Sequence, residues 1–147
     1  MQALQRLGII ATAVGLTVCA AWSAAQANPI VLEEQGLLSS GDSVLDDGSL
    51  YDAYKFSGRG GEQITIYLES RDFDPYLILL DPSGRRMSEN DDISRTNRNS
   101  RLVITLPMTG TYTVVANSYE AGKNGSYRLR VVSQSLSSSS RAIAQTR

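Results

Sequence analysis

Short segments in which apolar and polar residues alternate are the feature that most limits what this 147-residue chain can form. Such alternation has the period of a β-strand with one buried face, because successive strand side chains point to opposite sides. Residues 63–69, 101–106, 111–117 and 126–132 all show it. The side chains expected to be buried are Ile64, Ile66, Leu68, Leu102, Ile104, Leu106, Tyr112, Val114, Ala116, Tyr127, Leu129 and Val131.

Three further segments extend this pattern. Residues 51–56 point Tyr54 and Phe56 inward, residues 76–80 are apolar on both faces, as in a central strand, and residues 30–38 supply a weaker first strand. Turn sequences containing Gly, Pro and Asn separate the segments, and no helical period accompanies them. The sequence therefore predicts an all-β fold, a single antiparallel, jelly-roll-like β-sandwich of about seven to eight strands.

The first 27 residues are predicted to be a secretory signal peptide. Arg6 precedes an uncharged apolar run over 7–21, and Ala25-Gln26-Ala27 places small residues where a signal peptidase cleaves. The run is about 15 residues, shorter than the roughly 20 needed to span a bilayer. Two alternatives are a retained membrane anchor and lipoprotein processing at Cys19.

The expected organisation is thus a signal peptide over 1–27, a β-sandwich domain over 28–132 and a Ser-rich disordered tail over 133–147. Signal-peptide removal would leave a secreted or periplasmic protein that is not an integral membrane protein. Because Cys19 lies in the predicted signal peptide, the mature chain would contain no disulfide.

Composition excludes several classes of function. The formal net charge of −1 argues against nucleic-acid binding, which requires clustered Lys and Arg. The chain has no His, so serine triads, Cys–His pairs and imidazole metal sites are excluded. Only carboxylates remain as acid–base groups, and a small sandwich offers little room for a glycosidase cleft. We therefore expect no enzyme.

Seven short motifs follow one another between Leu37 and Val132. They occupy residues 52–56, 61–66, 72–79, 81–84, 89–92, 106–112 and 125–129. In order and spacing they resemble the bacterial pre-peptidase C-terminal domain, a small secreted β-sandwich. The resemblance implies a non-catalytic module: such domains usually follow a secreted peptidase and are often removed on maturation, and relatives in collagenases bind collagen, some of them with calcium. The acidic segment that opens the family pattern is replaced here by Leu32-Glu33-Glu34-Gln35.

Loop carboxylates suggest a calcium site. Asp72, Asp74, Asp91 and Asp92 lie in loops that the family fold would bring toward one end of the sandwich, and calcium takes six to eight oxygen ligands on flexible loops. A second acidic cluster is Asp46, Asp47 and Asp52. The alternative is that these Asp residues stabilise turns by bonding their own backbone.

The sequence also contains two candidate binding surfaces. Residues 88–100 form a long polar loop containing Arg95 and Arg98, which serves either as a recognition loop or as a solvated loop whose charges cancel. Tyr67, Arg128 and Arg130 lie on the solvent faces of two predicted strands and could bind a peptide or a polysaccharide.

The sequence leaves one main function and two alternatives. The main one is a secreted, non-catalytic binding or accessory module that recognises a protein or polysaccharide partner at the cell surface or outside the cell. The alternatives are a structural or self-associating envelope protein and an accessory domain split from a secreted peptidase.

Overall fold

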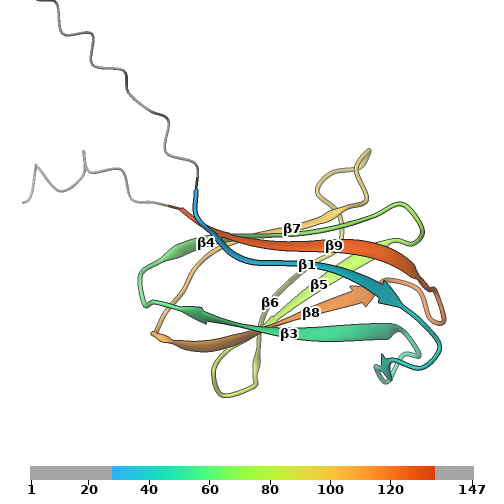
Figure 1. The fold of residues 1–147 in the computed structure, drawn as a ribbon, viewed down its shortest axis with the longest axis horizontal. Coiled ribbons are helices and arrows are strands. Elements are labelled where there is room, and N and C mark those ends of the chain that lie inside the picture. Colours follow the sequence, from blue (N-terminus) through green and yellow to red (C-terminus); the bar gives the residue numbers. More distant parts are fainter. Residues whose placement is uncertain (1–27, 135–147) are drawn as a thin grey trace, which may run out of the picture.

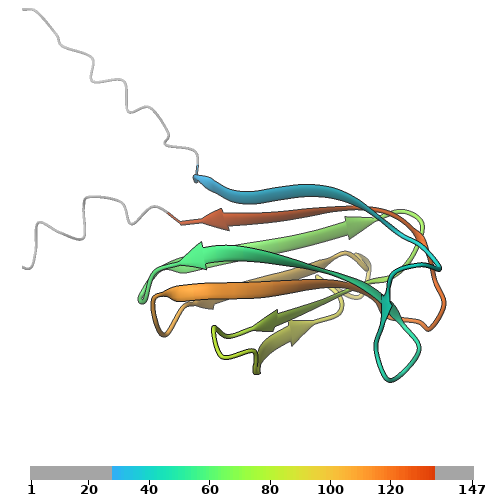
Figure 2. The same cartoon turned by 60° about the horizontal axis from the view of Figure 1, so that its bottom comes forward.

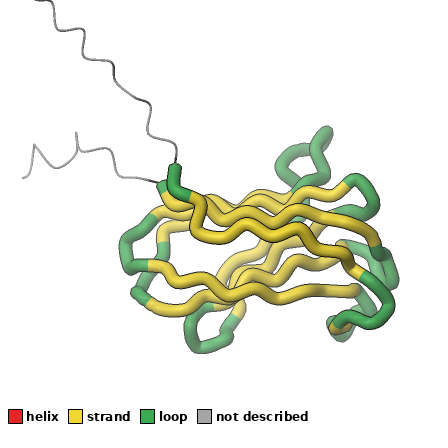
Figure 3. The backbone as a smooth tube through the Cα atoms, in the orientation of Figure 1, coloured by secondary structure: helices red, strands yellow, loops and turns green. Residues whose placement is uncertain are grey.

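The computed structural model describes residues 28–134, which form two antiparallel β-sheets packed face to face (Figures 1 and 3). The predicted signal peptide and residues 135–147 of the predicted tail lie outside this range. One sheet has the strand order β1-β9-β4-β7 and the other β2-β3-β8-β5-β6. The strands are β1 (Ile30–Leu38), β2 (Ser43–Val44), β3 (Leu50–Gly58), β4 (Gln63–Ser70), β5 (Pro75–Leu80), β6 (Arg86–Asn90), β7 (Ser100–Thr105), β8 (Gly110–Ser118) and β9 (Gly125–Ser133).

The predicted all-β sandwich is confirmed, and each expected strand is present. The described residues form nine strands. The two additional ones, β2 and β6, had no alternating signal, because β2 has two residues and β6 contains Met87 as its one apolar side chain. The loop predicted over 88–100 accordingly begins after Asn90. At the other end of the domain, β9 includes Ser133, which the sequence placed at the start of the tail.

The core consists of the side chains that alternation points inward from both sheets. Leu68, Tyr112 and Leu129 are fully buried, whereas Ile104 and Tyr54 are only half-buried. β5 contributes Leu77 and Leu79 and lies inside its sheet between β8 and β6, as its apolar faces predicted. Burying each large apolar side chain stabilises the fold by about 1.5–3 kcal/mol, so the sandwich does not require a disulfide.

A hydrogen-bonded chain of three side chains connects the two sheets. Tyr127 on β9 donates to Asp52 Oδ2 on β3 at 2.5 Å, and its hydroxyl lies 2.6 Å from that of Tyr54. Burial is the main cause that raises the pKa of Tyr127, followed by the hydrogen bond to Asp52. Gly36 on β1 leaves the space that the Tyr127 ring occupies, since a Cβ built at Gly36 would overlap that ring.

The two ends of the sandwich differ in what they present. At one end the start of β1 and the finish of β9 lie side by side, with Ser133 N donating to Pro29 O at 2.9 Å (Figures 1 and 2). At the opposite end are the connections 71–74, 91–99 and 119–124. No helix within residues 28–134 is long and apolar enough to cross a membrane.

Candidate functional site

Three of the four predicted calcium ligands meet at the loop end of the sandwich. Asp74 directly precedes β5, while Asp91 and Asp92 directly follow β6. Because β5 and β6 are paired antiparallel, the start of one strand lies beside the finish of the other. One carboxylate oxygen from each of the three residues lies within 4.8 Å of the other two.

Two oxygens of this acidic cluster (Asp74, Asp91 and Asp92) are buried without a partner. Among residues 28–134, no hydrogen-bond donor reaches Asp74 Oδ1 or Asp91 Oδ1, and the Asp74 side chain is only 16% exposed. Arg98 pairs with the cluster, its Nη1 lying 3.2 Å from Asp74 Oδ2. A buried carboxylate oxygen without a donor is costly, and a bound cation would satisfy it.

Burial and mutual repulsion both act on these carboxyl groups. Burial is the main cause that raises the pKa of Asp74, with Arg98 acting against it and Asp92 adding to it. For Asp91, burial again raises the pKa most, followed by the charges of Asp92 and Asp74. Raised carboxyl pKa values mean that the folded state disfavours the charged forms. The cluster therefore holds excess negative charge that a divalent cation would offset.

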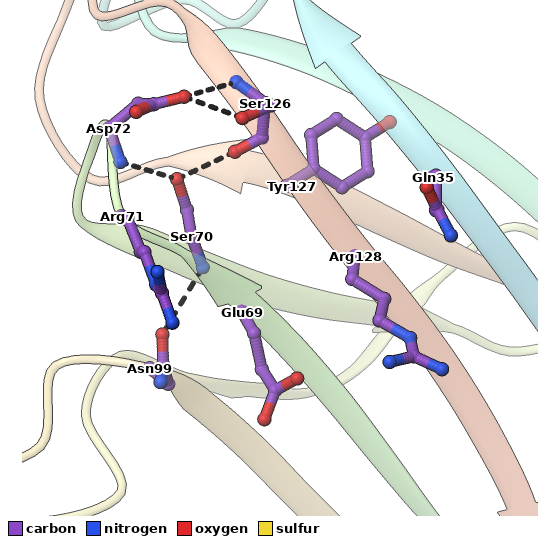
Figure 4. A pocket seen from close by; sticks show the side chains of 9 residues that line it. All are labelled: Gln35, Glu69, Ser70, Arg71, Asp72, Asn99, Ser126, Tyr127 and Arg128. Carbon is purple, nitrogen blue, oxygen red and sulfur yellow. Dashed lines mark hydrogen bonds between the residues drawn. The ribbon is translucent and has the colours of Figure 1, made fainter.

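Asp72, the fourth predicted ligand, faces a different partner. Its Oδ2 accepts from Ser126 N at 2.8 Å and from Ser126 Oγ at 2.6 Å, bonds that lower the pKa of Asp72 (Figure 4). The Asp72 backbone N–H donates to Ser70 Oγ at 3.1 Å. Asp72 thus connects the β4–β5 loop to β9, as a turn-stabilising residue does.

The second acidic cluster is not brought together as a group of ligands within residues 28–134. Asp47 accepts from Ser49 N at 2.9 Å and from Ser49 Oγ, which lowers the pKa of Asp47 and stabilises the turn before β3. Asp52 belongs to the Tyr127 hydrogen-bond chain. Their roles are those of turn and core residues.

The five predicted binding residues separate into two groups. Tyr67, Arg128 and Arg130 share the outer face of the β1-β9-β4-β7 sheet, with the Arg130 guanidinium 5.1 Å from the Tyr67 ring centroid. Arg128 Nε donates to Glu33 Oε1 at 2.9 Å, and the two side chains form an ion pair. Arg95 and Arg98 instead lie in the 91–99 loop.

A shallow polar pocket of about 570 Å³ joins the outer face to the loop end. Figure 4 shows Arg128 and Glu69 on its face side and Arg71 and Asn99 on its loop side. A neighbouring pocket contains Arg71, Arg98 and Lys123. The sequence predicted that the loops of Asp72/Asp74 and Asp91/Asp92 lie at one end, but it gave no indication that 119–124 joins them or that Arg71 and Lys123 line the site.

Residues 50–118 match the model of the bacterial pre-peptidase C-terminal domain. No curated protein matches the chain. Among solved structures, the periplasmic g-type lysozyme inhibitor PliG of Aeromonas hydrophila has a TM-score of 0.53 and 14% identity, over 70% of this chain and 85% of that one. PliG of Salmonella Typhimurium has a TM-score of 0.49 and 19% identity, over 70% and 86% of the two chains.

A third solved structure, the pre-peptidase C-terminal domain of a Bacillus anthracis collagenase, has a TM-score of 0.47 and 17% identity, over 69% of this chain and 89% of that one. The match to the family model and the two-sheet architecture together confirm the resemblance found in the sequence. Residues 50–118, which run from β3 to β8, are therefore similar to the bacterial pre-peptidase C-terminal domain.

Proposed function

We propose that this chain is an exported, non-catalytic module that binds another protein, and that a g-type lysozyme is such a partner. The observation that carries the proposal is the gathering of the connections 71–74, 91–99 and 119–124 at the end of the sandwich opposite Pro29 and Ser133. Rigid sandwiches with clustered loops commonly bind through those loops. The fold shared with a periplasmic lysozyme inhibitor supports the choice of partner.

A direct test measures both binding and catalysis with the exported protein. We expect the chain to bind a purified g-type lysozyme and to slow its lysis of bacterial cell walls. The chain alone should hydrolyse cell walls, esters and peptides no faster than the background rate. Absence of lysozyme binding would contradict the proposed partner. Turnover by the chain alone, lost on Asp74→Asn in a folded variant, would contradict the non-catalytic assignment.

Export itself is part of the proposal and has its own test. The order of Arg6, the apolar run over 7–21 and Ala25-Gln26-Ala27 supports cleavage after Ala27. We expect the intact mass of the protein recovered from the periplasm or medium to correspond to a chain that begins at Asn28. A mature species that retains residues 1–27, or that is lipidated at Cys19, would show that the segment acts as an anchor instead.

Self-association through sheet edges is the weaker alternative. β1 is an edge strand of nine residues, long enough to pair with a second copy. However, Glu34 shares the inward face of β1 with Gly36, which faces the Tyr127 ring. A charged residue that points inward from an edge strand disfavours edge-to-edge pairing. The outer-face group is also a weaker candidate, because Arg128 is already paired with Glu33 and Arg130 with Tyr67.

We further propose that the acidic cluster binds one calcium ion. The two buried, unpartnered oxygens and the raised pKa values of Asp74 and Asp91 support this. The ion would connect the start of β5 to the loop that follows β6, and so stabilise the end of the sandwich that we propose for binding.

A further inference from the structure

The 91–99 loop is held in one shape by its own hydrogen bonds. Asn97 N donates to Ser94 O at 3.0 Å and Ser94 N to Asn97 O at 3.2 Å, which makes Arg95 and Thr96 the central residues of a tight turn. Ile93 N, nearer the base, donates to Asn99 O at 2.7 Å. A loop that is already ordered loses little conformational entropy when a partner binds it.

The base of the loop is attached to the sandwich on both sides. Asn90 Nδ2 donates to Asp92 O at 3.1 Å and to Arg101 O at 3.0 Å. Asn99 Oδ1 accepts from Ser70 N at 3.2 Å, which joins the loop to the end of β4. Figures 1 and 3 show that the tip stands clear of both sheets. The loop is therefore a fixed, convex projection.

The tip is cationic although the chain as a whole is slightly acidic. Residues 93–99 contain Arg95 and Arg98 and no acidic residue, and residues 94–98 are all exposed. Arg98 is paired with Asp74, whereas Arg95 forms no ion pair within residues 28–134. An arginine guanidinium binds a carboxylate through two parallel hydrogen bonds. The Arg95 guanidinium at the tip of the loop is thus suited to binding a carboxylate.

We propose that Arg95, at the apex of the 91–99 loop, enters a concave, carboxylate-lined cleft of the protein partner. This inference rests on the proposed function and adds the contact residue and the chemistry of the partner surface. A glycoside hydrolase presents such a surface, because a pair of Asp or Glu side chains flanks its substrate cleft. A convex tip fits a cleft, whereas an extended polysaccharide binds along grooves and flat aromatic faces, which this loop does not provide.

The experiment compares two charge reversals in the full exported chain. Dissociation constants for a purified g-type lysozyme are measured by calorimetry at low salt for the wild type, Arg95→Glu and Arg59→Glu. Arg59 is an exposed arginine in the turn between β3 and β4, at the end of the sandwich away from the 91–99 loop, and its reversal changes the net charge by the same amount. We expect Arg95→Glu to weaken binding at least tenfold, Arg59→Glu less than twofold, and Arg95→Lys to retain part of the affinity.

Each other outcome has a definite meaning. Wild-type binding that Arg95→Glu leaves unchanged, or that both reversals weaken equally, would overturn this inference and leave the proposed function standing. If the wild type does not bind the lysozyme, the proposed function itself is overturned, and this inference with it. Wild-type retention on purified peptidoglycan that is lost in Arg95→Glu, with no lysozyme binding, would assign the tip to a polysaccharide and overturn the inference. Arg95→Glu should melt within about 2 °C of the wild type, because Arg95 is exposed and unpaired.

Discussion

Millimolar calcium in place of excess chelator should raise the melting temperature of the protein by on the order of 10 °C at fixed ionic strength. At a free concentration about a hundred times its dissociation constant, one ion stabilises the folded state by roughly 2.7 kcal/mol. A domain of this size converts each kcal/mol into several degrees. The expected site is the acidic cluster, where Asp74 Oδ1 and Asp91 Oδ1 are buried without donors.

Substitutions within the acidic cluster should affect the melting temperature in chelator and the melting temperature in calcium differently. In chelator, Asp91→Asn should melt at or above the wild type, because it removes a partly buried charge that Asp74 and Asp92 repel. The rise in melting temperature on adding calcium should largely disappear in this variant. Asp46→Asn is the matched control, an exposed Asp outside the cluster, and should keep the full shift.

The pH dependence in chelator has a definite sign. The pKa values of Asp74 and Asp91 are higher in the folded protein than the ordinary value, so the folded state binds protons more tightly than the unfolded one. These two groups therefore contribute stability that falls as the pH rises through their raised pKa values, and the calcium shift should grow over the same range.

Two outcomes would contradict the calcium proposal. A calcium-induced rise in melting temperature below about 2 °C would mean that calcium binding contributes little to folding stability, and the three Asp residues would then act as turn-formers only. A large shift that persists in an Asp91→Asn, Asp92→Asn double variant would place the ion elsewhere, with Asp46, Asp47 and Asp52 the next residues to test.

Gly36→Ala should destabilise the protein by about 2 kcal/mol, which corresponds to a fall in melting temperature on the order of 10 °C. The added methyl group would overlap the Tyr127 ring, so β1 or the ring must move. The Tyr127 hydroxyl is bonded to Asp52 and Tyr54 on the opposite sheet, and moving the ring would strain those bonds. Chemical denaturation of wild type and variant measures the difference in unfolding free energy.

A double-mutant cycle separates this clash from a general effect of removing glycine. In a Tyr127→Leu background the same Gly36→Ala change should cost less than about 0.5 kcal/mol, because the overlapping atoms are absent. Gly41→Ala is the control for the backbone effect, since a Cβ at Gly41 meets nothing within 4 Å. Equal costs of Gly36→Ala in both backgrounds would show that the Tyr127 ring is not what excludes a side chain at position 36.

Alternation predicted the strands and most of the core because it records which face of each strand is buried. It missed β6, an edge strand that presents Arg86 and Glu89 to solvent and so lacks an apolar face. At the candidate site, the sequence suggested that Asp72 and Asp74 act together. In the irregular β4–β5 connection they diverge, Asp72 toward Ser126 and Asp74 toward Asp91 and Asp92.

Contacts between distant segments set the rest of the site. The bond between Tyr127 and Asp52 spans 75 positions of the chain, and its formation depends on how the two sheets stack. The sequence predicted that the Tyr127 ring is buried, but it contained no indication of which acceptor the hydroxyl would reach. The convergence of Arg71, Arg98 and Lys123 likewise depends on three separate connections meeting at one end.

The chain enters and leaves the sandwich domain at adjacent points, so the domain could be inserted into another protein. Ile30 pairs with Val132 across β1 and β9, so a host polypeptide could enter and leave the domain through one surface position without being stretched. A short peptide joining Gln134 to Asn28 would likewise permit a circularly permuted chain that opens in the turn between β3 and β4. In both arrangements the 91–99 loop would still project from the opposite end of the domain, away from the new connection.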